Sequence, residues 1–203
     1  MTFATISLPV IFLFIATTIV MILIQDWRLI LISLGIQYAG VFVLVGNTWP
    51  LEMAIIKFIT GFFVSMILWV ELYRPPVEKS LSFEITEQVL RISDRIFRVL
   101  MAILIGLVVV SLAGEVAKWF LSASYYQIIG SLFLAGMGIL ILGMTNQPFK
   151  VIVGLLTFLS GFEILFASFE TSALMVWFFA FIHLAVALIG AYVIESGHIS
   201  VEK

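Results

Sequence analysis

Three ionisable side chains and one amide lie inside long apolar segments of this chain. They are Glu163 in Gly161-Phe-Glu-Ile-Leu-Phe, His183 in Phe-Ile-His-Leu-Ala, Lys57 in Ile-Ile-Lys-Phe-Ile-Thr-Gly, and Gln37. An ionisable group in hydrocarbon is costly, so it normally faces protein or water, has a partner, and marks an ion or proton pathway. We therefore take these four residues as the candidate proton-translocation site.

Glu163 and His183 each have a chemical and a structural interpretation. A carboxyl group among apolar residues can take up and release a proton, and Glu163 is the strongest candidate for this exchange. The alternative is a protonated glutamate that hydrogen-bonds a neighbouring helix. His183 is the side-chain type that titrates nearest physiological pH and can relay a proton. It can equally be a neutral histidine that is satisfied within the bundle.

Lys57 and Gln37 are the other two candidates. The ammonium of Lys57 can store or repel a proton and reach a carboxylate of a neighbouring subunit, or it can extend to the membrane surface. Gln37 cannot titrate, but its amide can hydrogen-bond and orient a water molecule or a partner carboxylate. The alternative role for Gln37 is a structural hydrogen bond between helices. Other carboxylates lie near helix ends and are expected to be solvated: Glu52, Glu71, Glu115, Glu170 and Glu195.

The composition identifies lipid as the solvent of these residues. Of 203 residues, 63% are hydrophobic and 11% are charged, which is far from a soluble domain. Backbone groups in hydrocarbon must be satisfied within their own element, so the long apolar runs predict helices. We predict an all-α integral membrane protein with about seven transmembrane helices. Their approximate ranges are 5–24, 28–47, 51–72, 98–120, 126–145, 150–169 and 173–194.

An internal repeat organises these helices. A shift of about 126 residues places segment 27–72 over 153–198 without a gap, with Gln37 over Glu163 and Lys57 over His183. Both units begin on the same side of the membrane, so the repeat is parallel, which argues against an inverted-repeat transporter. The predicted units are a three-helix repeat (1–73), a cytoplasmic linker with an interfacial amphipathic helix (74–97), a spacer helix (98–120) and a second three-helix repeat (121–203).

The basic residues predict the orientation. Lys118 alone lies on one side of a seven-span topology, so the positive-inside rule places the amino terminus outside and the carboxyl terminus in the cytoplasm. We expect a multi-pass protein of the cell's inner (plasma) membrane. The residues on the other side are Arg28, Arg74, Lys79, Arg91, Arg95, Arg98, Lys150 and Lys203.

Several functions are disfavoured by what the sequence lacks. Without cysteine the chain cannot bind an iron–sulfur cluster or a thiolate-ligated metal. Of its two histidines, His198 follows the last apolar segment, which argues against a bis-histidine haem. No basic cluster with interleaved aromatics predicts nucleic-acid binding. We expect no metal, no cofactor and no catalytic centre in this chain.

The carboxyl-terminal three segments, about 126–195, resemble the K-type subunit of respiratory complex I and the C-type subunit of Mrp sodium/proton antiporters. Those families have a basic hairpin, a Gly-hydrophobic-Glu helix and a third helix with a second buried acid. Lys150, Gly161-Phe162-Glu163 and His183 occupy these places here. The chain departs from the pattern at His183, where the families usually have a carboxylate, so a proton path would run through Glu163, His183 and their neighbours.

The whole chain resembles the E component of membrane hydrogenases of the formate-hydrogenlyase-like, hydrogenase-4 type. Gln37, Lys57 and Pro76-Val77-Glu78-Lys79 carry this likeness. It implies a proton- or sodium-translocating, non-redox subunit of a hetero-oligomeric oxidoreductase complex. The implied partners are antiporter-like membrane subunits and the membrane anchor of a redox arm. The alternatives are a purely structural or assembly subunit and a stand-alone small-solute carrier.

Overall fold

The computed structural model describes residues 4–73, 92–120 and 122–199, and within these ranges the chain forms seven α-helices joined by turns. Six are long and apolar enough to cross a membrane, and the first contributes the shorter apolar segment Ser7–Leu23. The predicted all-α, multi-pass membrane fold is confirmed. The helices are α1 (Ala4–Leu23), α2 (Trp27–Val45), α3 (Leu51–Tyr73), α4 (Ile92–Trp119), α5 (Tyr125–Gly143), α6 (Pro148–Phe166) and α7 (Ala173–Ile199).

Local signals in the sequence set several of these helix ends. The Asp26 side chain accepts a hydrogen bond from the backbone N–H of Arg28 at 2.9 Å and so caps α2. Ser124 caps α5 by accepting from the backbone N–H of Gln127 at 3.3 Å. Pro148 opens α6, where its missing N–H costs no helical hydrogen bond. The helix starts are therefore encoded locally.

Two helices extend beyond their predicted ranges. α4 begins at Ile92 rather than at 98, and α7 continues to Ile199 rather than ending at 194. Asp94 and Arg95 belong to α4: an acidic residue in the first turn is favoured by the helix dipole, and arginine has good helix propensity. Most of the predicted linker with its amphipathic helix, 74–91, lies outside the described residues.

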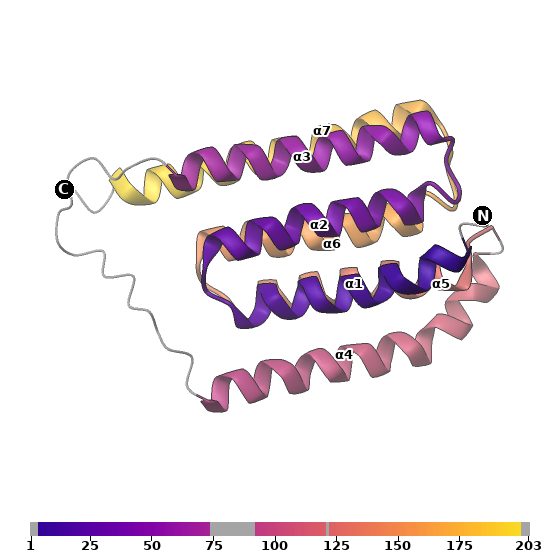
Figure 1. Cartoon of the computed structure of the whole chain (residues 1–203), viewed down its shortest axis with the longest axis horizontal. Helices are drawn as coiled ribbons and strands as arrows, with labels where there is room; N and C mark the ends of the chain where they lie inside the picture. The colour runs from indigo at the N-terminus through magenta and orange to yellow at the C-terminus, as the bar shows by residue number, and fades with distance from the viewer. Residues whose placement is uncertain (1–3, 74–91, 121, 200–203) are drawn as a thin grey trace.

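The helices form two rows in the same order. α1, α2 and α3 lie side by side, and each packs on one helix of the second row, α1 on α5, α2 on α6 and α3 on α7 (Figure 1). α4 joins the rows and packs against α5 and α1. The chain is thus two parallel three-helix units joined by a spacer helix, as predicted.

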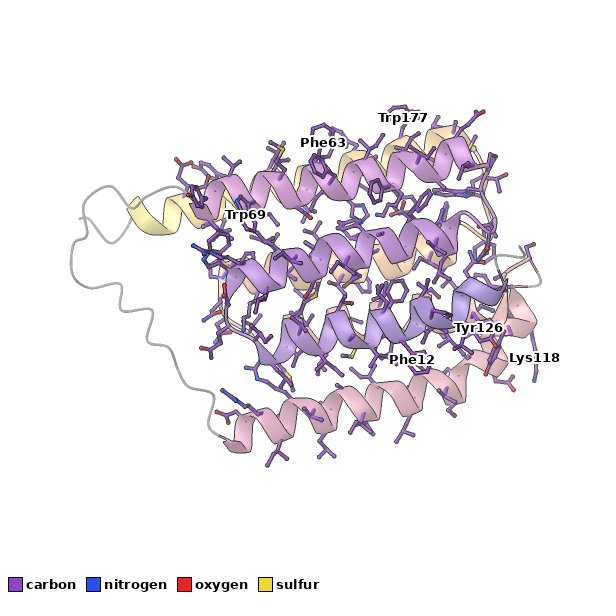
Figure 2. All side chains as sticks on the ribbon, in the orientation of Figure 1. Phe12, Phe63, Trp69, Lys118, Tyr126 and Trp177 are labelled. Carbon is purple, nitrogen blue, oxygen red and sulfur yellow. The ribbon has the colours of Figure 1, made fainter. Side chains whose placement is uncertain are left out.

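The two ends of the bundle differ. We call the end where α1 begins and the α2–α3 and α6–α7 turns lie the amino end, and the opposite end, where α7 ends, the carboxyl end (Figure 1). Lys118 lies at the amino end (Figure 2). Four of the described basic residues lie within the first two turns of helices that start at the carboxyl end: Arg28, Arg95, Arg98 and Lys150.

The register of the repeat differs from the predicted shift of 126 residues. α2 begins at Trp27 and α6 at Pro148, which are 121 residues apart, and the starts of α3 and α7 are 122 apart. By helix position, Glu163 corresponds to Phe42 rather than to Gln37. The predicted pairing of polar residues is therefore wrong. Uniformly apolar helices can be aligned at several registers, and the predicted alignment was selected on a few polar residues alone.

Hydrogen bonds tie the rows together at both ends. At the amino end, the buried indole of Trp49 donates to the carbonyl of Glu170 at 3.0 Å and so joins the α2–α3 turn to the α6–α7 turn. At the carboxyl end, Lys150 Nζ donates to the carbonyl of Ile24, just past the end of α1, at 3.3 Å. Each end of the bundle is closed by a bond between its two units.

The outer surface is apolar, as a lipid-facing surface must be. Phe63 and Trp177 point outward from α3 and α7 (Figure 2) and are about half exposed or more. Burial within the chain is uneven: 56% of the membrane-spanning window is buried in α2, α5 and α6, but only 11% in α4. The spacer helix is therefore the most peripheral span of the described chain.

The tightest helix contact lies between α5 and α6, and it generates a test of the fold. A Cβ at Gly138 would overlap the backbone of Phe158. We predict that Gly138→Val lowers the free energy of unfolding by at least about 1–3 kcal/mol, because the helices would be forced apart. Thermal unfolding of the purified chain in detergent measures this effect. Gly114→Val on α4, where a Cβ meets no atom within 4 Å, is the control and should unfold much closer to the wild type.

Candidate functional site

Three of the four predicted site residues meet in the interior of the bundle. Lys57 of α3, Glu163 of α6 and His183 of α7 are each no more than 2% exposed. The Lys57 ammonium forms an ion pair with Oε2 of Glu163 and lies 3.0 Å from Nε2 of His183. The same carboxylate oxygen is 3.8 Å from Nε2 of His183. We call these three residues the buried triad.

A backbone contact indicates which ring nitrogen of His183 carries a proton. Its Nδ1 lies 2.8 Å from the carbonyl oxygen of Phe179, one turn earlier in α7. A carbonyl only accepts, so Nδ1 carries the proton and Nε2 of the neutral ring is left as an acceptor. Lys57 can then donate to Glu163 and to His183 at once. In this state the triad has no net charge, as an apolar interior demands.

Tyr38 of α2 is a fourth residue in contact with the buried triad, and the sequence did not predict this position. The Lys57 ammonium lies 4.7 Å from the centre of the Tyr38 ring, within the range of a cation–π interaction. The ring also meets His183 edge-on, with centroids 5.7 Å apart. A tyrosine within an apolar run gives no signal that it faces a cation, so only packing could reveal it.

Glycines bring the helices close enough for these contacts. A Cβ at Gly161 would overlap the backbone of α5 at Ala135, so α6 lies directly against α5 on that side. Glu163 is two residues further on and therefore about 200° around the helix. Its carboxylate is turned away from α5 and toward Lys57. On α3, Gly61 leaves room for the ring of Tyr38 one turn after Lys57.

Gln37 does not join the triad. It is fully buried on α2, and neither amide atom has a hydrogen-bond partner among the described residues. It precedes Tyr38, and neighbouring helical residues point about 100° apart, so the tyrosine faces Lys57 and the amide does not. A buried amide of this kind is expected to hydrogen-bond water or a partner.

The carboxylates near helix ends lie where the sequence suggested. Glu52, Glu115, Glu170 and Glu195 are exposed, and Glu71 is half-buried. Among the described residues, no group of three or more His, Asp or Glu residues is placed to hold a metal ion. The buried triad is thus the one place in the described chain where a carboxylate, an amine and an imidazole meet away from water.

The triad can hold a proton at three positions. Transfer from Lys57 to Glu163 yields a neutral amine and a neutral acid, and transfer from Lys57 to Nε2 of His183 yields an imidazolium beside the carboxylate. One further proton can be accepted by Glu163 or His183, which gives the triad a positive charge. The geometry therefore permits proton exchange among three helices that belong to both repeats.

No family model, curated protein or solved structure matches this chain.

The contacts within the triad predict energetic coupling between Lys57 and Glu163. Removing one partner leaves the other buried without its counter-charge, whereas removing both does not. We expect Lys57→Met and Glu163→Gln each to destabilise the protein and the double variant to be less destabilised than the sum, by about 0.5–3 kcal/mol. Unfolding of the four proteins in detergent gives this coupling energy.

The exposed pair Lys118 and Glu115, whose Nζ and Oε1 are 2.7 Å apart at the end of α4, supplies a matched control. Lys118→Met and Glu115→Gln should act additively, because solvent screens such a pair. Additive effects at Lys57 and Glu163 as well would show that the two buried groups do not interact in solution.

Proposed function

We propose that this chain is a proton- or sodium-translocating membrane subunit of a complex I-like, membrane hydrogenase-like or Mrp-like assembly. The observation that carries the proposal is the buried triad of Lys57, Glu163 and His183. Ionisable side chains in transmembrane helices are rare and mark ion pathways by default. In the proposed mechanism Glu163 exchanges the proton, His183 relays it, and Lys57 links the site to the next subunit.

The electrostatics of the triad support a switching role. The Lys57 ammonium favours the ionised form of Glu163 while it donates to both Glu163 and His183. A shift of the Lys57 ammonium toward another carboxylate would leave Glu163 without its counter-charge and favour proton uptake there. Movement of one lysine head group thereby couples the charge of a neighbouring subunit to protonation of this one. Gln37 would hold water or a partner carboxylate beside this path.

The expected partners follow from the resemblance. They are antiporter-like membrane subunits and the membrane anchor of a redox arm, in a hetero-oligomer of the inner (plasma) membrane. The chain itself would carry no redox centre, and electron transfer would occur in other subunits. Its amino terminus would be outside and its carboxyl end in the cytoplasm, which accords with the basic residues at the carboxyl end.

A purely structural role is the second candidate, and the same site favours it. The triad joins α3, α6 and α7, and the hydrogen bonds of Lys57 and His183 are already satisfied within the chain. Such a network can serve to fix helix packing in an assembly. The two candidates differ in what they require of Glu163, because a structural role needs a hydrogen-bonding group there and translocation needs an ionisable one.

A transport measurement distinguishes the two roles. We expect Glu163→Gln, which keeps the shape and a hydrogen bond, to reduce ion transport by at least about tenfold in vesicles that contain the purified assembly. Proton and sodium movement are followed with a pH-sensitive dye and a sodium-sensitive dye. Transport is driven by the assembly's own electron donor or by an imposed sodium gradient. Lys57→Met should give a comparable loss.

A control variant and a second measurement complete this test. Glu170→Gln, at an exposed carboxylate near a helix end, is the control and should retain transport. The partners that co-purify with each variant are counted by mass spectrometry. Full transport by an assembled Glu163→Gln variant would reject translocation through this site in favour of the structural role.

The proposal also predicts what surrounds the chain. Purification of the tagged chain from its native membrane in mild detergent should recover antiporter-like subunits, which mass spectrometry identifies. Any nickel, iron–sulfur or flavin protein among them would indicate the electron donor. Recovery of the chain alone would count against the proposed assembly and favour a stand-alone carrier.

A further inference from the structure

The spacer helix leaves an apolar cleft at the edge of the bundle. α1, α4 and α5 enclose a volume of about 180 Å³, lined by residues that include Ile19, Leu23, Ile103, Gly106 and Met137. Figure 1 shows α4 inclined to α1, so that the two ribbons separate toward the carboxyl end. The cleft is smaller than the roughly 300–1,000 Å³ of small-molecule sites, and its lining is apolar apart from one arginine.

A cation lines this cleft. Arg98, in the second turn of α4, is the charged residue in its lining, and Nη2 of Arg98 donates to the carbonyl of Met144 at the end of α5 at 3.3 Å. That bond uses one of the five donors of the guanidinium. Lys150, at the start of α6, is a second cation at the carboxyl end, but it is buried and lies outside the lining of the cleft. One positive charge, that of Arg98, therefore lies at the carboxyl end of the apolar cleft.

Neither cation is neutralised by an ion pair with a carboxylate in the described part of the chain. There the hydrogen bonds of Arg98 and Lys150 end on carbonyl oxygens, of Met144 and Ile24, and no described carboxylate forms an ion pair with either. The guanidinium of Arg98 therefore keeps donors with which it can bind an anion. A ligand that fills the cleft and binds this guanidinium must present a negative group at the membrane surface and an apolar chain within the membrane.

We propose that this cleft binds an anionic phospholipid, with an acyl chain between α1 and α4 and its phosphate at Arg98. Guanidinium groups bind phosphate through strong charge-assisted hydrogen bonds. Basic pockets between helices at the membrane surface are a known form of lipid recognition. An anionic lipid matches both the apolar lining of the cleft and its positive charge. A neutral lipid matches only the apolar lining. The site is separate from the buried triad and does not depend on the proposed function.

Native mass spectrometry of the full chain tests this assignment. The protein is incubated with equal amounts of phosphatidylglycerol and phosphatidylcholine that carry identical acyl chains, and the retained lipids are counted. We expect the anionic lipid to be retained preferentially, by about fivefold for each cation that contacts it. Arg98→Gln should lower this preference about fivefold, whereas Arg95→Gln, at an exposed position on the same helix, should leave it unchanged.

A second pair of variants tests the cleft itself. A Cβ at Gly106 meets no atom within 4 Å, so Gly106→Phe can be accommodated while its ring occupies the space for the acyl chain. It should reduce the number of retained phosphatidylglycerol molecules. Gly114→Phe adds the same ring to α4 at an exposed position and should not. Equal retention of the two lipids by the wild type, or undiminished binding by Gly106→Phe, would overturn the proposal.

Discussion

A charged amino group in an apolar interior must be given a counter-charge and hydrogen-bond acceptors, and the arrangement of α3, α6 and α7 meets this demand for Lys57. Lys57 is 2% exposed, and its ammonium contacts a carboxylate, an imidazole nitrogen and the face of an aromatic ring. Each contact comes from a different helix. A displacement of any of these helices would expose the ammonium to hydrocarbon, so the ion pair fixes the packing of both repeats around one point.

The close approach of the helices is the condition for these contacts. Without the hydrophobic effect between helices in lipid, small residues supply the packing, and the glycines on α5 and α6 do so here. With α6 held against α5 at Gly161, Glu163 is directed into the interior between the rows. Gly61 has the same effect on the other row, where it admits the ring of Tyr38. The residues that set the packing and those that carry the chemistry thus lie within about one turn of each other on the same helices.

The sequence indicated much of this arrangement, because its strongest signals are physical. Long apolar runs predicted the helices, and isolated charges singled out Lys57, Glu163 and His183. The contacts between different helices could not be predicted from the sequence. The contact of Lys57 with Glu163 and the part played by Tyr38 depend on how α3 turns about its axis. The repeat register was misjudged because helices that are apolar on every side match at more than one offset.

The stacking of the two units has a consequence for how the molecule can be surrounded. Subunits related by a twofold axis present one surface to each other and leave identical surfaces outside, which closes the pair. Here α1, α2 and α3 lie on α5, α6 and α7 in the same order, a head-to-tail relation in which the two outer surfaces are formed by different faces of the repeat. The molecule therefore has a direction within the plane of the membrane. Neighbouring subunits on its two sides must recognise different surfaces. A linear array of subunits that includes this chain would therefore have a defined direction.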